Sequence, residues 1–249
     1  MALVPQSSSF DTREMSDYKL FKFKHFEINQ NDLVFKVGTD AFVLGAWINT
    51  EKAPTQILDV GTGTGVLSLM MAQKFPNAKI LAIDSNSNAT QLVQLNFEQN
   101  DIGRNCRAVS FDFMKFDETQ TYELIVSNPP YFLDSFIPKQ TVLDEAKHLK
   151  SSDLILFFQK AAQLLSANGK LNMIFPVDAR FESTAEEVGL FPERILHVYG
   201  KPGLLKRKCI QFGFERKEPQ IESLTIRTSS GAYTEMYKKL TADFHGISL

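Results

Sequence analysis

The stretch from Gln56 to Ala72, Gln-Ile-Leu-Asp-Val-Gly-Thr-Gly-Thr-Gly-Val-Leu-Ser-Leu-Met-Met-Ala, decides the fold of this chain. It opens with a short apolar run, 56–60, that is typical of a buried strand, and the apolar run from Val66 onward continues as a helix. Glycines at every second position between the two runs allow a tight turn and a close backbone approach to a ligand. The N-terminus of the helix faces the same ligand. The stretch therefore predicts a strand, a ligand-binding turn and a helix.

Acidic residues accompany this turn. Asp59 directly precedes the glycines, where a carboxylate would crowd a pyrophosphate but would suit an ammonium group. The next predicted strand, 79–83, ends in Asp84, about 20 residues past the glycines, where an acidic side chain holds a ribose diol. We therefore expect a cofactor pocket lined by Asp59, Asp84 and the turn glycines, which are Gly61, Gly63 and Gly65.

A third predicted strand, 106–110, leads into Phe111-Asp112-Phe113. An acidic residue beside an aromatic ring can accept a hydrogen bond from an adenine amine, while the ring covers the base. The alternative function of Asp112 is to cap the loop.

The fourth predicted strand, 123–126, ends in Ser127-Asn128-Pro129-Pro130-Tyr131. Two prolines fix the backbone and remove two N–H donors, so the corner offers acceptors: the Asn128 side-chain oxygen and the carbonyls around Pro129. Two acceptors can hold both hydrogens of a planar NH2 group, and Tyr131 can stack on the rest of the substrate. An ordinary turn with a buried tyrosine is the alternative.

Strands and helices alternate along the chain, which indicates an open, mostly parallel α/β sheet with helices on both faces. The acidic, glycine and asparagine residues named above all follow strands, so they share the edge where such sheets bind ligands. A fifth strand is predicted at 170–175. Two final strands, 195–199 and 209–214, form an antiparallel C-terminal hairpin and bring the predicted sheet to seven strands. Their link, 200–208, carries four cations that either meet phosphates or only keep the hairpin soluble.

Outside these strands, the pattern predicts one domain over 18–249 behind a polar, flexible tail at 1–17. An N-terminal extension, 18–50, holds a hairpin of strands 20–28 and 33–37 and a helix over 41–48. Thr39 or Asp40 caps that helix, or Asp40 lies on the rim of the cofactor pocket. Residues 132–150 form either a substrate loop or a solvated connection, followed by a helix from Ser152 or Asp153 through Leu165.

Composition excludes several classes of protein. The net charge of -2 gives no global footprint for nucleic acid, although a local basic patch remains compatible with it. The two cysteines lie far apart, so neither a disulfide framework nor a metal site is expected. Without a signal segment or an apolar run of membrane-spanning length, we expect a cytoplasmic protein.

Together these motifs resemble the class I S-adenosylmethionine-dependent methyltransferases, which have a Rossmann-like fold. The Asn-Pro-Pro-Tyr form is similar to that of enzymes that methylate adenine N6, guanine N2 or glutamine side-chain nitrogens. More narrowly, segments at both ends of the range 18–245 resemble the bacterial valine-tRNA (adenine-37-N6) methyltransferases: 23–26, 36–40, 45–47, 201–203, 224–226, 233–235 and 240–244. The chain departs from that family at Ala41, where glycine is expected, and at 144–148, where the family has an arginine-containing segment.

The resemblance implies S-adenosylmethionine as cofactor and an adenine of the tRNA anticodon loop, flipped out of its stack, as substrate. It also implies in-line transfer of the sulfonium methyl to the N6 amine, without a dedicated general base. The implied cofactor site consists of Asp40 at its rim, a bed of Gly61, Gly63 and Gly65, Asp59 near the methionine end, Asp84 on the ribose, Asp112 and Phe113 flanking the adenine, and Asn128. In the implied catalytic corner, Asn128 and the Pro129 carbonyl bind the amine, Pro130 stiffens the turn and Tyr131 stacks on the base.

Three other functions stay open at this point. A protein glutamine-N5 methyltransferase shares the corner but usually carries a helical N-terminal domain, whereas 18–50 predicts a hairpin and one helix. A DNA or rRNA exocyclic-amine methyltransferase is the second, and a DNA enzyme would need an added recognition domain. A non-catalytic, cofactor-binding RNA module is the third, and the intact Asn128–Tyr131 corner argues against it.

Overall fold

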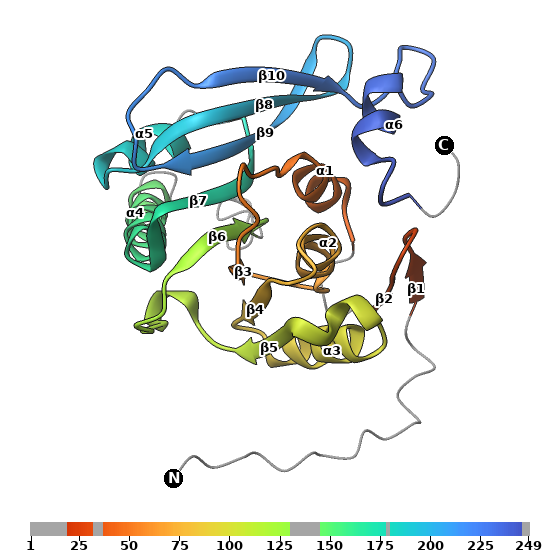
Figure 1. Ribbon diagram of the computed structural model, residues 1–249. Helices are drawn as coiled ribbons and strands as arrows, with labels where there is room; N and C mark the ends of the chain where they lie inside the picture. The colour runs from red at the N-terminus through yellow and green to blue at the C-terminus, as the bar shows by residue number, and fades with distance from the viewer. Residues whose placement is uncertain (1–18, 32–36, 130–144, 178–179, 246–249) are drawn as a thin grey trace.

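The structure, a computed structural model, describes residues 19–31, 37–129, 145–177 and 180–245, with the backbone alone for 145–152. Its centre is an eight-stranded sheet in the order β10-β8-β9-β7-β6-β3-β4-β5 (Figure 1). Within the described residues, β9 runs antiparallel to both of its neighbours and the other pairings in this sheet are parallel. The strands are β3 Gln56–Val60, β4 Lys79–Asp84, β5 Cys106–Ser110, β6 Tyr122–Ser127, β7 Leu165–Pro176, β8 Phe191–Lys201, β9 Leu204–Gly213 and β10 Gln220–Thr225.

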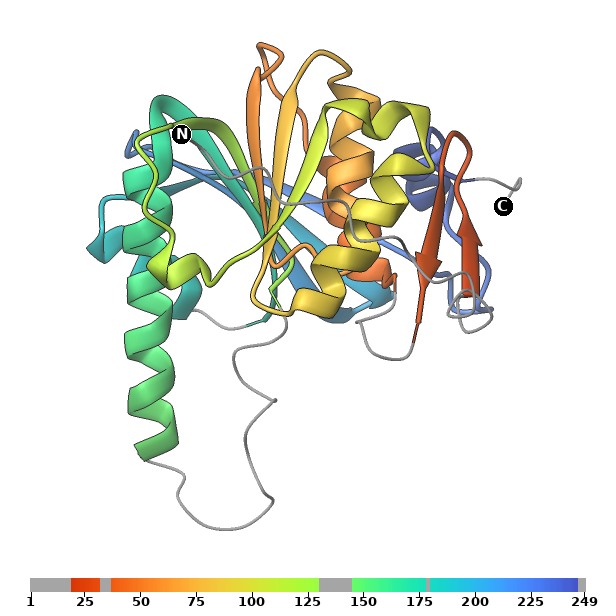
Figure 2. The same cartoon turned by 90° about the horizontal axis from the view of Figure 1, so that it is seen from below.

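Helices cover both faces of the sheet (Figure 2). Successive strand residues point to opposite faces, so Ile57 packs into one apolar cluster and Leu58 into the other. The first cluster lies under α1 Thr39–Trp47, α2 Val66–Lys74, α3 Ser87–Glu98 and α6 Glu235–Thr241, and the second under α4 Glu145–Leu164 and α5 Arg180–Glu187. This arrangement confirms the predicted α/β class and the predicted mostly parallel sheet.

The expected count of seven strands was wrong because β10 adds an eighth, paired in parallel with β8 at the edge of the sheet. Of its six residues only Leu224 is buried. An edge strand that packs so few side chains leaves no apolar run in the sequence, which is why the pattern missed it.

The N-terminal hairpin also differs from the prediction. The stretch expected to be one strand, 20–28, folds back on itself as β1 Lys19–Lys22 and β2 Glu27–Gln30, which form a separate antiparallel pair. The turn between them is closed by Phe23 N donating to Phe26 O at 2.9 Å. Both phenylalanine rings are buried and stacked, 4.3 Å apart. Burying residues three apart requires a turn, and a continuous strand would place them on opposite faces. The second strand expected at 33–37 lies outside the described residues, apart from Val37.

Two helix starts require correction. α4 begins at Glu145, so the charged run 145–148 is helical and the predicted start at Ser152 or Asp153 was too late. Glu, Ala, Lys and Leu at 145–149 favour helix over the predicted loop. α1 is preceded by Gly38 as its N-cap, without a side-chain cap hydrogen bond, rather than by Thr39 or Asp40.

The C-terminal hairpin is longer than predicted. β8 and β9 extend through most of the expected link 200–208, and the turn between them consists of Pro202 and Gly203. Gly203 has a φ of +73°, a left-handed conformation that suits glycine in a tight turn. None of the helices in the described ranges is long and apolar enough to cross a membrane.

Candidate active site

The predicted site residues gather where the strand order changes direction. From β3 the chain proceeds to β4 and β5 on one side, then returns to β6 on the other side of β3. The carboxyl ends of β3 and β6 therefore flank a topological switch point, the usual ligand-binding position in such sheets. The two ends are tied together by Ser127 Oγ, which donates to Val60 O at 2.8 Å within the buried core.

The glycine turn lies over the end of β4. The backbone N–H groups of Gly61 and Thr62 both donate to Ile83 O, at 2.9 and 3.1 Å. Gly61, Gly63 and Gly65 have φ values of +70°, +57° and +81°, so all three adopt left-handed conformations that other residues seldom take. The alternating glycines predicted from the sequence are thus required by the backbone of the turn.

The last two glycines of the turn have different surroundings. A Cβ atom on Gly65 would approach Val93 Cγ1 to 3.0 Å and Phe97 Cε1 to 3.2 Å, so this glycine lets the start of α2 pack against α3. A Cβ atom on Gly63 would meet no described atom within 4 Å. The turn is therefore closed towards α3 and open at Gly63, which leaves space for a ligand beside its backbone.

Asp59 lies at the base of the turn and is fully buried. Its Oδ2 accepts hydrogen bonds from Thr62 Oγ1 at 2.7 Å, from Ser68 Oγ at 2.6 Å and from Ser68 N at 3.1 Å. Its Oδ1 is buried without a hydrogen-bond partner among the described residues. Burial raises the pKa of Asp59 to about 6, against the lowering effect of these hydrogen bonds. A buried carboxylate oxygen that lacks a partner is suited to a cationic ligand group.

Asp84 ends β4 and holds the turn from below. Its Oδ2 accepts from Gly63 N at 3.0 Å, and its Oδ1 accepts from Asn86 N at 2.9 Å. Asn86 in turn caps α3, where its side chain accepts from Asn88 N at 3.0 Å. Asp84 thus fixes both the glycine turn and the start of α3, while its side chain stays partly exposed at the site.

The structure separates the two aromatic residues around Asp112. Phe113 is buried and packs against Phe157 with ring centroids 4.8 Å apart, so its ring belongs to the core. Phe111 is the exposed ring, at 40%, and it lies against Phe116. Asp112 caps the short helix that follows by accepting from Met114 N at 3.0 Å. Asp112 therefore caps the loop, and of the two rings beside it Phe111 is the exposed one.

Asn128 and Pro129 follow β6 directly, next to the end of β3. Asn128 is partly exposed, whereas Pro129 is buried. Asn128 thus lies at the switch point, on the same sheet edge as Asp59 and Asp84. Pro130 and Tyr131 lie outside the described residues.

Asp40 is engaged in the framework of the protein. From the first turn of α1, its Oδ2 forms an ion pair with Arg207 Nε of β9 at 2.7 Å, and both side chains are 26% exposed. The pair ties α1 to the C-terminal hairpin at the sheet edge that carries the site. Sequence patterning could not reveal this partner because Arg207 is 167 residues away.

Asn96 was missed, although the sequence carries a signal for it. It occupies an apolar-face position of α3, in register with Ala89, Leu92 and Val93, and is fully buried. Its Nδ2 donates to Thr64 O in the glycine turn at 2.9 Å and to Asn29 O of β2 at 3.0 Å. A lone polar residue on the apolar face of a helix indicates such a buried hydrogen-bonding role.

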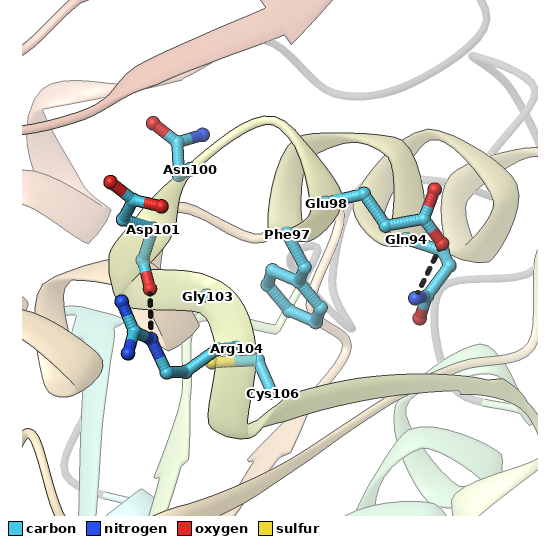
Figure 3. A pocket seen from close by; sticks show the side chains of 8 residues that line it. All are labelled: Gln94, Phe97, Glu98, Asn100, Asp101, Gly103, Arg104 and Cys106. Carbon is cyan, nitrogen blue, oxygen red and sulfur yellow. Dashed lines mark hydrogen bonds between the residues drawn. The ribbon is translucent and has the colours of Figure 1, made fainter.

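A pocket in another part of the molecule lies between the C-terminal end of α3 and the start of β5 (Figure 3). Cys106, the first residue of β5, lines it, so the pocket lies at the amino end of this strand, whereas the site lies at the carboxyl ends of the strands. Two hydrogen bonds join residues that line it: Gln94 Nε2 donates to Glu98 Oε1 at 2.9 Å, and Arg104 Nε donates to Asp101 O at 3.0 Å. Burial also raises the pKa of the Cys106 thiol to about 12, which suits an inert thiol.

The comparison with solved structures identifies the fold. A predicted O-methyltransferase from Agrobacterium tumefaciens superimposes with a TM-score of 0.61 over 82% of this chain and 96% of its own, at 15% identity. A ribosomal protein L11 methylase from Lactobacillus delbrueckii gives a TM-score of 0.52 over 74% of this chain and 82% of its own, at 18% identity. The fold is therefore that of the Rossmann-like methyltransferases.

The family follows from sequence. The methyltransferase small domain model matches residues 36–189. A protein from Christiangramia forsetii named tRNA1(Val) (adenine(37)-N6)-methyltransferase is 37% identical over 90% of this chain and 97% of its own. One of the same name from Bacteroides fragilis is 35% identical over 90% of this chain and 97% of its own. The chain belongs to the methyltransferase small domain family, in the branch of these tRNA1(Val) (adenine(37)-N6)-methyltransferases, and is a methyltransferase.

Proposed function

We propose that this protein transfers a methyl group from S-adenosylmethionine to the N6 amine of an adenine in tRNA, namely adenine 37 of a valine tRNA. The observation that carries the proposal is 37% identity, over 90% of this chain, to a relative named for that reaction. The site geometry supports it, since the Asn128 corner and the glycine turn meet at one switch point. A tRNA substrate further implies that the protein works in the cytoplasm.

The residues around the glycine turn fit the proposed cofactor. When bound, S-adenosylmethionine supplies a methyl group made electrophilic by a positively charged sulfur. Oδ1 of Asp59, buried and without a hydrogen-bond partner among the described residues, suits the cofactor's ammonium group. The free space at Gly63 lets the cofactor approach the backbone of the turn closely. Asp84 would accept from the ribose hydroxyls, and Phe111 with Asp112 would flank the adenine ring. Within the described residues, no cluster of three or more His, Cys, Asp or Glu side chains could hold a metal ion.

The Asn128 corner would hold the target amine. The Asn128 side-chain oxygen and the Pro129 carbonyl accept its two hydrogens, which aims the nitrogen lone pair in one direction. Positive charge grows on this nitrogen as the reaction proceeds, so both hydrogen bonds strengthen towards the transition state. Pro130 would stiffen the corner, and Tyr131 would stack on the base, as the motif implies. An adenine in an anticodon loop is already partly unpaired, which lowers the cost of turning it into the site.

The proposal is tested by methyl transfer from radiolabelled S-adenosylmethionine to tRNA from cells that lack the modification, followed by nucleoside analysis. We expect labelled N6-methyladenosine with the wild-type protein. Asn128→Ala should lower the rate by about 100-fold or more, because an acceptor used in the transition state is lost, while tRNA binding is retained. Asn105→Ala serves as the matched control, since Asn105 is exposed at the end of a short 3-10 helix and its side chain donates only to Pro76 O among the described contacts.

Label in a protein or in DNA, with none in tRNA, would contradict the proposed substrate and leave the methyltransferase assignment intact. Equal rates for wild type and Asn128→Ala would instead remove Asn128 from the catalytic corner. Both outcomes are read from the same assay. The first tests the identity of the substrate, and the second tests the catalytic role of Asn128.

A further inference from the structure

The hairpin formed by β8 and β9 carries a concentrated positive charge. The segment 199–208 contains Lys201, Lys206, Arg207 and Lys208 and no acidic residue, in a chain whose net charge is -2. Its turn, Pro202 and Gly203, is exposed. A local basic patch on an otherwise slightly acidic protein is a feature of surfaces that meet phosphates.

Two of the four cations form ion pairs with neighbouring helices. Arg207 pairs with Asp40 of α1 at 2.7 Å, and Lys208 pairs with Glu182 of α5 at 2.6 Å. The partner helices cover opposite faces of the sheet, so adjacent residues of β9 anchor the hairpin from both sides. Both pairs are largely shielded from solvent, with 17–26% exposed side chains. These two cations hold the hairpin in place and are not available as docking groups.

Lys201 and Lys206 are different. Both are exposed, and neither forms an ion pair with any residue that the structure describes. Lys201 ends β8 directly before the turn, and Lys206 is the third residue of β9. Two ammonium groups without an ion pair among the described residues therefore flank the turn, and the Arg207 and Lys208 pairs anchor the strand that follows it.

The strand register places this turn on the edge of the sheet that carries the site. Ser127, next to Asn128, is level with Met173 of β7, and β7 ends three residues later at Pro176, level with Arg207 of β9. Beyond Arg207, β9 extends three more residues in the same direction to its first residue, Leu204, which lies opposite Lys201. At about 3.3 Å per residue, the hairpin tip projects roughly 20 Å beyond the end of β6 along the strand direction.

We propose that Lys201 and Lys206 form a docking point for the phosphate backbone of the tRNA, away from the target adenine. The inference rests on the proposed function and adds to it where the RNA meets the protein. At about 3.4 Å per stacked nucleotide, the projection corresponds to roughly six nucleotides, so the contact falls outside the base that reacts. Phosphate contacts of this kind fix orientation and affinity without reading sequence.

The test compares Lys201→Ala/Lys206→Ala with wild type in tRNA binding across a salt series from 50 to 200 mM. Each phosphate contact contributes about 0.7 to 0.9 to the slope of log K against log salt. The magnitude of this slope should therefore be smaller for the double variant than for the wild type by about 1.5. The ratio of wild-type to variant affinity should fall about 10-fold between 50 and 200 mM salt. The KM for tRNA should rise, with kcat at saturating tRNA and the affinity for S-adenosylmethionine unchanged.

Lys52→Ala/Lys79→Ala is the matched control. Both lysines are exposed, lie before β3 and at the start of β4 on the opposite sheet edge, and form no ion pair with the described residues. This variant removes the same charge and should keep the wild-type slope.

If both double variants match wild type in affinity and slope, while wild type methylates tRNA, the docking inference is overturned and the proposed function stands. Equal losses in both variants would show a general charge effect and also overturn it. If wild type neither binds nor methylates tRNA, the proposed function fails and the docking inference fails with it.

Discussion

At the scale of single residues, Asp59 combines full burial with an uneven distribution of hydrogen bonds. Oδ2 receives three donors from Thr62 and Ser68, whereas Oδ1 has none among the described residues. The protein thus fixes the position of this carboxylate with one oxygen and leaves the other unsatisfied. Such an arrangement costs stability in the free protein and favours binding of a cation, which would supply the missing partner.

The raised pKa of Asp59 gives a prediction for stability against pH. The unfolded chain loses this proton near pH 3.8, whereas the folded protein keeps it to about pH 6. Between these values the folded state binds more protons, so the stability of the wild type falls as pH rises through the window. Between pH 3.5 and 7, the unfolding free energy of the wild type should fall by about 3 kcal/mol relative to that of Asp59→Asn.

Urea unfolding of both proteins at several pH values measures this difference, and groups that titrate equally in both cancel. Parallel stability curves for wild type and Asp59→Asn would show that Asp59 titrates normally in the folded protein.

Sequence patterns predicted where the candidate site residues lie in the fold when local chain geometry determines their positions. Asp59, Asp84 and the glycines follow strand ends, and a strand followed by a turn and a helix leaves few positions for them. Ser68 and Phe111 escaped prediction for different reasons. Ser68 lies in an apolar helical run that gives no sign of facing Asp59, and Phe111 and Phe113 are distinguished only by which ring the core buries.

At the scale of secondary-structure elements, α3 connects the N-terminal hairpin with the glycine turn. Asn96 donates to Thr64 O and Asn29 O and accepts from Asn29 N at 2.8 Å. One turn later, Asn100 accepts from Glu27 N at 2.9 Å and donates to Glu27 O at 2.8 Å. Both asparagines thus extend the hydrogen bonding of β2, and of the two only Asn96, among the described contacts, also reaches the glycine turn.

This difference makes a matched pair of variants. Asn96→Ala should weaken S-adenosylmethionine binding about 10-fold, because the glycine turn loses a buried hydrogen bond that fixes Thr64. Asn100→Ala loosens the same hairpin without touching the turn and should leave cofactor affinity unchanged. Calorimetric titration of both variants measures the effect, at a temperature where thermal unfolding shows each to be folded. Equal affinities would mean that the turn keeps its shape without Asn96.

The elements themselves were predicted with uneven success for physical reasons. Strands β3 and β5 were confirmed with their bounds, because each leaves a short, largely apolar run that ends at a glycine or a polar residue. The start of α4 was missed because charged residues 145–148 suggested solvated loop, although such residues also form exposed helix. The first hairpin was misread because alternation within 20–28 suggested one strand, while Phe23 and Phe26 both enter the core.

At the scale of the whole molecule, the two ends of the described chain pack together. Phe23 pairs with His245 in an isolated bridge, and Lys24 N donates to Phe244 O at 3.0 Å. Phe244 is 1% exposed and lies against Phe42 of α1, with ring centroids 6.3 Å apart. The N-terminal extension and the C-terminal tail therefore share one apolar cluster with the sheet. Sequence patterning could not foresee this contact, which joins residues more than two hundred positions apart.

This packing leads us to expect that residues 18–249 unfold as a single domain, which Phe244→Ala tests. Removing a buried phenylalanine ring should lower the free energy of unfolding by about 3 to 5 kcal/mol. Met236 of α6 is 59% exposed, so Met236→Ala should change the free energy of unfolding by about 0.5 kcal/mol or less. Because the clusters on both faces share the same sheet, Phe244→Ala should shift one cooperative transition, seen alike by far-ultraviolet circular dichroism and by Trp47 fluorescence. If the variant splits unfolding into two transitions, with Trp47 following only one, the terminal segments form a unit separable from the methyltransferase sheet.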